Sequence, residues 1–150
     1  MISINNLTVA YGSYTLLDNI NFHISETDKI GLVGKNGAGK STIIRHLTGI
    51  YRQDSGSVTL DGQIIDNDPD VKARIGYIPD EIFYFTSSTM AQMHRYYRGL
   101  YPKFDEELYQ RLRPVFQLPD GPIRRFSKGM QKQAAFQLAL SCRPDVLILD

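Results

Sequence analysis

The chain has 150 residues, 42% of them hydrophobic and 22% charged, and a formal net charge of +1. This length and composition suit one globular domain with a hydrophobic core. A charge near zero gives no bulk attraction to nucleic acid or to an anionic membrane surface. The single cysteine, Cys142, excludes an internal disulfide, and no apolar run approaches the roughly 20 residues needed to cross a bilayer. We therefore expect a protein of a reducing compartment that has no nucleic-acid partner.

The first half of the chain carries mostly strand signals. Apolar and polar residues alternate over residues 2–25, which predicts half-buried strands. Residues 29–33 are more uniformly apolar and predict a central, buried strand. A helix is expected over residues 39–48. Two further strands are predicted at residues 57–60 and 74–78.

The second half of the chain is mostly helical in pattern. Apolar residues recur at helical spacing between residues 86 and 117 and predict two helices. A third helix is expected over residues 128–142. Four apolar residues, 146–149, then predict a buried strand that ends at Asp150.

A glycine-rich loop follows the predicted central strand: residues 34–42 read GKNGAGKST. Glycines let the backbone curl so that successive N–H groups point at phosphate oxygens, and the next helix adds the positive end of its dipole. In such a P-loop the Lys40 ammonium reaches the outer phosphates, and the Ser41 hydroxyl completes a Mg²⁺ shell. The residues expected to surround the phosphates are Gly34, Asn36, Gly37, Ala38, Gly39, Lys40, Ser41 and Thr42.

Asp150 is a second candidate for metal chemistry. A carboxylate at the carboxyl end of a buried strand can hold Mg²⁺ directly or through water. Many buried strands end in an acidic residue, so this pattern alone carries little weight. Together with the P-loop it indicates one metal–phosphate site, to which Asp150 and Ser41 both contribute.

Residues 126–131, FSKGMQ, stand just before the third predicted helix. This segment resembles the signature of ABC-type ATPases, usually written LSGGQ. Other segments are similar to that family in the family's order, namely Tyr11, residues 54–58, residues 60–62, residues 75–79 and residues 143–145. The resemblance covers the whole chain and implies an α/β fold. This fold is a P-loop NTPase with a RecA-like core, an N-terminal antiparallel β subdomain and an inserted α-helical subdomain.

The resemblance implies ATP and Mg²⁺ as cofactors and assigns roles to residues. Tyr11 would stack on the adenine. Lys40, Asp80 and Asp150 would be the catalytic residues, and Asp80 and Asp150 would hold the metal together with Ser41. The signature would grip the ATP of a second nucleotide-binding domain, so that two domains close head-to-tail as a homodimer or heterodimer. The signature residues are Ser127, Lys128, Gly129, Met130 and Gln131.

Three features depart from the family pattern. Lys128 and Met130 replace residues of the usual signature, and this variant looks like the ATPase subunits of drug and antibiotic exporters. Asp80 stands where the family usually has Gln, so the shorter side chain would meet metal and water with a different geometry. The chain ends at Asp150, where the family continues with a Glu that polarises the attacking water. We therefore expect an N-terminal fragment that does not turn over ATP by itself.

The expected organisation is one incomplete ABC nucleotide-binding domain over residues 1–150. Residues 1–85 would form the β subdomain and P-loop core, residues 86–142 the helical subdomain with the signature, and residues 143–150 the Walker B strand. The remainder of the domain would be absent. The family places another strand between the strand that precedes the P-loop (the Walker A strand, residues 29–33) and the Walker B strand. Without it, both strands would present unpaired backbone groups.

The favoured function is an ATP-hydrolysing subunit that energises a separate membrane permease, in an exporter. Such a subunit would be cytoplasmic and held by the permease at the inner face of the cell membrane. One alternative is a soluble ABC ATPase of translation or DNA repair, although residues 82–125 have ordinary length and mixed charge, which disfavours the repair type. Another alternative is a nucleotide-binding fragment without turnover.

Residues 81–100 are rich in aromatic and methionine side chains. Such side chains suit a socket for a permease helix, because they bury large areas and adapt to shape. The residues expected to remain partly exposed and to make this contact are Tyr84, Phe85 and Tyr96. The alternative is that most of these side chains pack the helical subdomain internally. The residues spaced like one buried helix face are Met90, Met93 and Tyr97.

Overall fold

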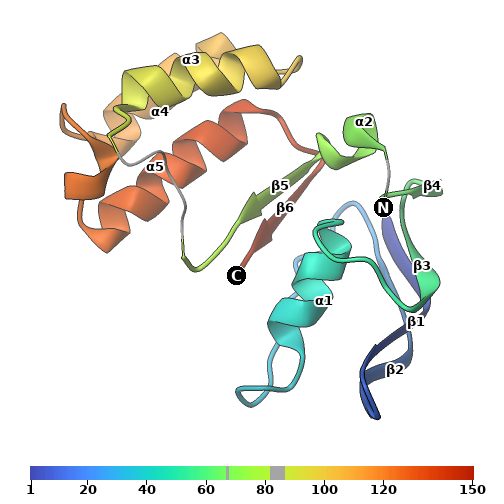
Figure 1. Cartoon of the computed structure of the whole chain (residues 1–150). Helices are drawn as coiled ribbons and strands as arrows, with labels where there is room; N and C mark the ends of the chain where they lie inside the picture. The colour runs from blue at the N-terminus through green and yellow to red at the C-terminus, as the bar shows by residue number, and fades with distance from the viewer. Residues whose placement is uncertain (67, 82–86) are drawn as a thin grey trace. The chain divides into compact units, whose positions relative to one another are not determined.

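The computed structural model describes residues 1–66, 68–81 and 87–150 (Figure 1). The described residues fall into two units, Met1–Lys72 and Ala73–Asp150. The first unit contains the P-loop. The second contains three long helices, the signature segment and the final strand.

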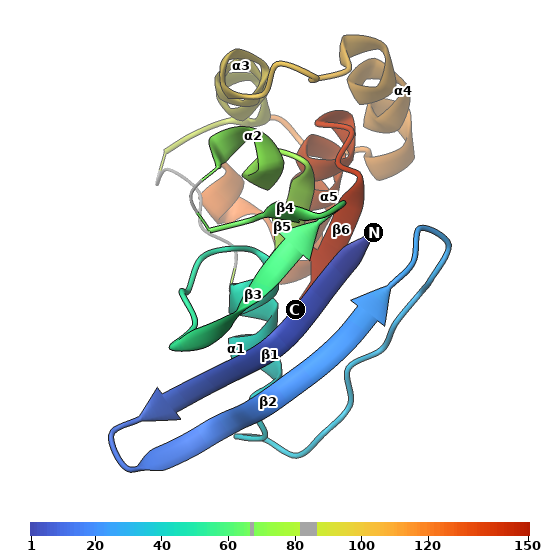
Figure 2. The ribbon, with the colours of Figure 1, turned by 90° about the vertical axis from the view of Figure 1, so that its right-hand side faces the viewer.

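A four-stranded antiparallel sheet forms most of the first unit, with the strand order β2-β1-β3-β4 (Figure 2). Its strands are β1 (Ile2–Tyr11), β2 (Tyr14–Ile24), β3 (Ser55–Leu60) and β4 (Gln63–Ile64). In β1, Ile4 pairs with Phe22 of β2 on one side and with Val58 of β3 on the other. Ile4 and Val58 are buried, because alternate side chains of a strand share one face of the sheet. The prediction of half-buried strands over residues 2–25 is confirmed.

Helix α1 (Lys40–Leu47) follows the P-loop directly, and a short helix α2 (Pro69–Lys72) ends the first unit. His46 is buried inside the unit, and its Nδ1 lies 2.7 Å from the carbonyl oxygen of Thr42. Gly49 follows α1 with a φ of +65°, a left-handed conformation that ends helices and favours glycine. The helix predicted over residues 39–48 is confirmed.

The central strand predicted over residues 29–33 is wrong, since the structure assigns no strand there. The apolar side chains of this segment are exposed, Val33 to 93%. An extended segment is stable as a strand when a neighbour pairs with its backbone and covers its side chains. Among the residues that the structure describes, no strand pairs with this segment.

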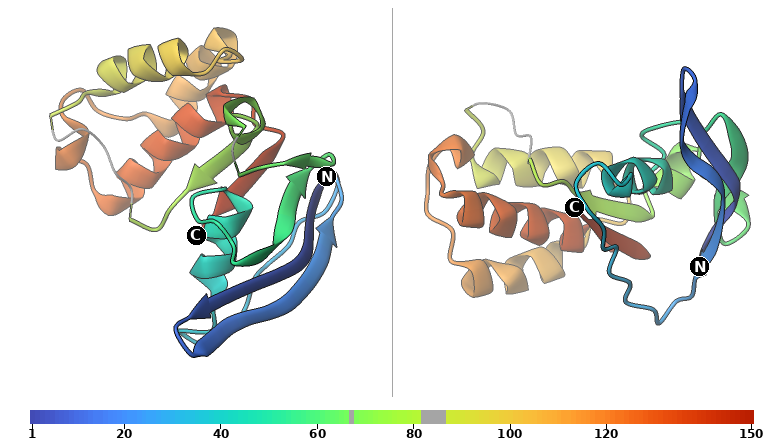
Figure 3. Two further views of the ribbon diagram at one scale, coloured as in Figure 1. Left: turned by 45° about the vertical axis from the view of Figure 1, so that its right-hand side comes forward. Right: turned by 90° about the horizontal axis from the view of Figure 1, so that it is seen from below.

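Three helices and a two-stranded parallel sheet make up most of the second unit, and the helices lie side by side (Figures 1 and 3). The elements are β5 (Ile75–Ile78), α3 (Met90–Leu100), α4 (Glu106–Phe116), a 3-10 turn (Ile123–Arg125), α5 (Lys128–Ser141) and β6 (Val146–Leu149). All three long helices and both strands stand where the sequence predicts them. No helix in the described ranges is both long and apolar enough to cross a membrane.

Side chains from the three helices form the core of the second unit. The buried members are Met93, Tyr109, Ile123, Phe126 and Leu138, and the partly buried residues packed against them are Met90, Tyr97, Phe104, Leu118 and Met130. The structure thus shows the alternative given for residues 81–100, in which these side chains pack internally, for Met90, Met93 and Tyr97. Tyr96 is 48% exposed. Phe83, Tyr84 and Phe85 lie outside the described residues.

Side-chain caps define where the helices of the second unit begin. Thr89 accepts a hydrogen bond from the backbone N–H of Gln92, whose side chain accepts in return from the N–H of Thr89. Asp105 accepts from the N–H of Leu108 at 2.7 Å and from Nε of Arg143 at 2.8 Å. These two contacts hold the pKa of Asp105 below its ordinary value. Each cap satisfies N–H groups that have no partner inside the helix.

Gly56, at the start of β3, has no room for a side chain. Its φ is +88°, and a Cβ there would lie 2.4 Å from the carbonyl oxygen of Asn6. We expect Gly56→Ala to lower the free energy of unfolding by about 3 kcal/mol, because left-handed strain of about 1–2 kcal/mol adds to overpacking of about 1–3 kcal/mol. Urea denaturation measures this change.

The matched control is Gly62→Ala. Gly62 also has a positive φ, +79°, but the space around its Cα is open. Gly62→Ala should lower the free energy of unfolding by only about 1–2 kcal/mol, the cost of the left-handed strain. Equal losses in the two variants would show that the close approach to Asn6 does not restrict Gly56.

Candidate functional site

The P-loop leaves the start of α1 open to an anion. Gly37 and Gly39 have φ values of +83° and +85°, which glycine adopts without strain. Gly39 is the N-cap of α1, so no side chain caps the helix, and no acidic residue lies in its first turn. Residues 34–38 are exposed. An uncapped helix start that follows an exposed, glycine-rich loop fits a phosphate group.

Lys40 places a positive charge against the backbone of this loop. Its Nζ donates to the carbonyl oxygen of Gly34 at 2.7 Å and to that of Lys35 at 2.9 Å. The ammonium therefore lies across the loop, beside the first turn of α1. A Cβ at Gly34 would lie 3.3 Å from Cβ of Ala38, so the loop closes tightly on itself around the lysine.

The strand hairpin that carries Tyr11 packs near the end of the P-loop. A Cβ at Gly39 would lie 3.2 Å from the side chain of Leu17 in β2. Leu17 pairs across the hairpin with Val9, two residues before Tyr11. Tyr11 itself is 57% exposed, at the end of β1, and pairs with Tyr14. An exposed aromatic face is thus available on the same unit as the P-loop.

Asp80 and Asp150 lie at the same edge of the parallel sheet. Ile78 pairs with Leu149, and each carboxylate follows the end of its strand by one or two residues. The backbone N–H of Asp150 donates to the carbonyl oxygen of Ile78 at 3.0 Å, and the hydroxyl of Tyr77 lies 3.4 Å from its Oδ2. Adjacent parallel strands therefore bring the two predicted carboxylates to one place.

Two carboxylates alone do not complete a metal shell. Across the described ranges, no group of three or more His, Cys, Asp or Glu residues could hold a metal ion. Mg²⁺ commonly takes one or two protein carboxylates, and water and phosphate oxygens supply its other ligands. The pair Asp80 and Asp150 fits that type of site, with nucleotide phosphates as the remaining ligands.

Lys132 of α5 holds Asp80, a contact that the sequence alone did not suggest. Its Nζ lies 2.9 Å from Oδ1 of Asp80. The hydrogen bond and the charge of Lys132 lower the pKa of Asp80, and Lys128 adds a weaker effect of the same sign. Asp80 is largely exposed, so it remains accessible as an anion. In the sequence, the only indication of this pair is that Lys132 follows Lys128 by about one turn of a predicted helix.

The signature residues divide into an exposed and a packed set. Ser127 is the N-cap of α5 and accepts from the backbone N–H of Met130 at 3.2 Å. Lys128 and Gly129 are exposed, and nothing lies closer than 4.0 Å to a Cβ built at Gly129. The side chain of Gln131 donates to the carbonyl oxygen of Phe126 at 3.2 Å.

Met130 packs against the core of the second unit. Together with Gln131 it fixes the turn before α5, while Ser127, Lys128 and Gly129 are the residues that a ligand could reach. The structural role of Ser127 as a helix cap is compatible with such a contact, because the hydroxyl retains further hydrogen-bonding capacity.

Cys142 has no role in this site. It is buried, and burial raises the pKa of its thiol to about 12. A thiol of that kind is not a nucleophile at neutral pH. Cys142 is a small, packed side chain of the second unit.

Comparison with known proteins identifies the family. A family model described as ABC transporter matches residues 17–150. The chain belongs to the ABC transporter family. Two relatives from Bacillus subtilis (strain 168) are the ABC transporter ATP-binding protein YtrB, 32% identical over 151 residues, and the linearmycin resistance ATP-binding protein LnrL, 31% identical over 157 residues.

Both alignments cover the whole of this ABC chain, against 52% of YtrB and 50% of LnrL. The chain thus spans about half the length of these curated relatives. A solved structure titled "Structure of ATP binding subunit of ABC transporter" superposes with a TM-score of 0.89 at 25% identity, over 100% of this chain and 65% of that one. The resemblance inferred from the signature and the predicted P-loop NTPase fold are confirmed.

Proposed function

We propose that this protein is the ATP-binding and ATP-hydrolysing subunit of an ABC transporter. The observation that carries the proposal is the P-loop, where the Lys40 ammonium lies beside an uncapped helix start in an exposed, glycine-rich turn. ABC domains bind ATP, and this loop offers the backbone donors and the cation that nucleotide phosphates need. Gly34, Asn36, Gly37, Ala38 and Thr42 complete the loop, and Tyr11 offers its exposed ring to the adenine.

The chemistry would need a cation for the phosphates and ligands for a metal ion. Lys40 places its charge on the outer phosphates, which stabilises the charge that develops in phosphoryl transfer. Ser41, Asp80 and Asp150 would hold Mg²⁺, with Lys132 keeping the carboxylate of Asp80 ionised and oriented. The metal, when bound, neutralises phosphate charge and orients the phosphates for in-line attack.

A second nucleotide-binding domain completes the assembly. Ser127, Lys128 and Gly129 form an exposed start to α5, and a helix start with a hydroxyl that can still donate suits a phosphate. This surface contacts the nucleotide held by the P-loop of the second domain, so ATP joins the two domains. Hydrolysis then removes the phosphate that bridges them.

The subunit energises a separate permease, in an exporter, at the cytoplasmic face of the membrane. The relative LnrL is named a linearmycin resistance ATP-binding protein, and removal of a toxic compound from the cell is one route to resistance. The FSKGMQ variant of the signature supports the same class. The permease, and not this nucleotide site, would select the transported compound.

Replacing Lys40 tests the nucleotide site. We expect Lys40→Ala to weaken ATP binding by about 2–5 kcal/mol, because it leaves the phosphate charge without its nearest cation. Isothermal titration calorimetry with Mg-ATP measures this loss. The control is Lys103→Ala, an exposed lysine of the second unit that lies outside the P-loop. Unchanged affinity in Lys40→Ala would refute the assignment.

Replacing Tyr11 tests the adenine contact. Tyr11→Ala should weaken ATP binding by about 1–3 kcal/mol, the range for base stacking on an aromatic ring, and Tyr11→Phe should retain it. Tyr14→Ala is the matched control, because Tyr14 is the exposed cross-strand neighbour of Tyr11. Binding of fluorescent ATP analogues serves as the measurement. An equal loss in Tyr11→Ala and Tyr14→Ala would point to hairpin damage instead of stacking.

Replacing Tyr96 tests the permease contact. Tyr96 is an exposed aromatic residue of α3, and we expect Tyr96→Glu to reduce co-purification with the permease at least about tenfold while ATP binding is unchanged, as loss of an aromatic interface anchor predicts. Val115→Glu is the control, since Val115 is an exposed apolar residue of α4. Normal assembly of Tyr96→Glu would place the contact elsewhere.

A further inference from the structure

A cavity of about 180 Å³ opens in the second unit between α3, α4 and α5. Met90 and Leu118 give it apolar walls, and His94 stacks on Tyr109 beside it with ring centroids 4.1 Å apart. This volume holds several water molecules or one small organic molecule. The P-loop, the carboxylates Asp80 and Asp150 and the signature do not line it.

Two largely buried residues line this cavity with polar atoms that have hydrogen-bonding capacity left. Tyr109 and Gln137 line it, and they are only 4% and 2% exposed. Gln137 donates to the carbonyl oxygen of Tyr109 at 3.3 Å. Within the described ranges, the hydroxyl of Tyr109 and the amide oxygen of Gln137 have no hydrogen-bond partner. Neither atom is among the described polar atoms that are sealed from solvent without a partner, so both are open to the cavity, which presents one unused donor and one unused acceptor.

Two opposite charges lie at the outer end. Arg113 and Asp120 line the cavity and are exposed. Arg113 donates to the amide oxygen of Gln110 at 3.4 Å, and no described carboxylate pairs with it. Asp120 likewise has no cationic partner in the described ranges. The cavity mouth therefore carries one positive and one negative group that do not neutralise each other.

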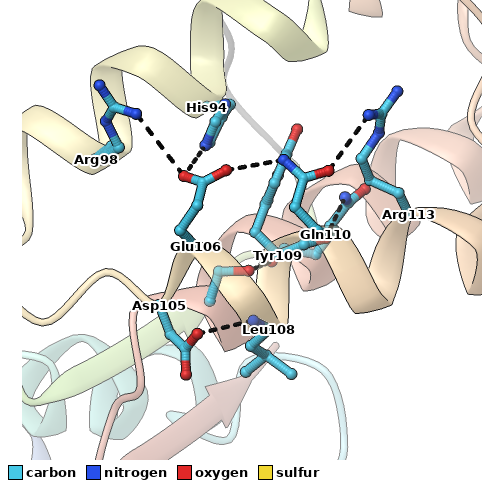
Figure 4. A network of polar contacts seen from close by, with 10 residues as sticks. His94, Arg98, Asp105, Glu106, Leu108, Tyr109, Gln110 and Arg113 are labelled. Carbon is cyan, nitrogen blue, oxygen red and sulfur yellow. Dashed lines mark hydrogen bonds and ion pairs between the residues drawn. The ribbon is translucent and has the colours of Figure 1, made fainter.

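The other charges beside the cavity are already paired. Figure 4 shows a series of contacts that runs from His94 through Glu106 and Gln110 to Arg113. Nε2 of His94 lies 2.7 Å from Glu106, and Arg98 lies 4.0 Å from the same carboxylate. This series fixes the side chains on one side of the cavity, so that Arg113 is the cation left for a ligand.

We propose that this cavity binds a free α-amino acid with a polar side chain. The carboxylate of the ligand pairs with Arg113 and its ammonium with Asp120, while its side chain exchanges hydrogen bonds with Tyr109 and Gln137. Asp120 would repel a simple anion, and Arg113 would repel a simple cation. A zwitterion therefore complements the mouth of the cavity better than either. The site is separate from the nucleotide site and does not depend on the proposed function.

L-Glutamine is a suitable probe, because its side-chain amide can both donate and accept. Titration into the purified protein, followed by ¹H–¹⁵N NMR, should give saturable shifts at the backbone amides around the cavity. Two analogues test the charges: glutaramic acid lacks the ammonium and 4-aminobutanamide lacks the carboxylate. Each should bind about tenfold more weakly, as the loss of one charge-assisted hydrogen bond predicts.

Paired variants separate recognition from structure. Arg113→Gln should weaken L-glutamine about tenfold and leave 4-aminobutanamide unaffected, and Asp120→Asn should weaken L-glutamine and leave glutaramic acid unaffected. Arg111→Gln, an exposed change on the same helix and outside the cavity, should alter nothing. Gln137→Leu should weaken all three probes.

Absence of saturable shifts in the millimolar range, or equal binding of L-glutamine and both analogues, would overturn the proposal. ATP affinity measured on the same samples should not change in any of these variants. If the unsubstituted protein did not bind ATP, that result would contradict the proposed function. The amino-acid site would still be judged by its own titrations.

Discussion

The parallel pairing of β5 with β6 is the constraint on which the second unit depends. The two strands lie side by side from Ile75 and Val146 to Ile78 and Leu149, so their carboxyl ends coincide. This coincidence places Asp80 beside Asp150, although 70 positions separate them in the sequence. Helix α5 packs on β5, which brings Lys132 within reach of Asp80. One backbone ladder thus determines which charged groups meet.

The same need for a paired neighbouring strand explains why the strand predicted over residues 29–33 is wrong. Residues 29–33 and residues 146–149 are both short apolar runs, and both predict buried strands. The second run finds β5 as a partner and becomes β6, whereas the first has no described partner and stays exposed. Apolar composition records a tendency to be buried, but a strand also needs a neighbour for its N–H and C=O groups. Local sequence does not specify that neighbour.

Most of the candidate site could be predicted because its signals are local. The P-loop, the signature and Asp150 each lie within a few consecutive residues. Lys132 and Gln137 could not be found in the same way, because their partners, Asp80 and Tyr109, lie 52 and 28 positions away. Their roles depend on how α5 packs, and no short pattern encodes that packing. The roles given to the local motifs remain predictions, since no ligand contact tests them.

Helix α5 connects the separate features of the second unit. Ser127 caps its start within the signature, Lys132 reaches Asp80, and Gln137 lines the cavity and binds the backbone of α4. At its end, the carbonyl oxygen of Ser141 accepts from the N–H of Asp105, the residue that caps α4. Side chains therefore hold α5 at its start and in its middle, and a backbone hydrogen bond holds it at its end. The signature and the cavity are thus built on the same helix, because Ser127 begins it and Gln137 lies on it nearly three turns later.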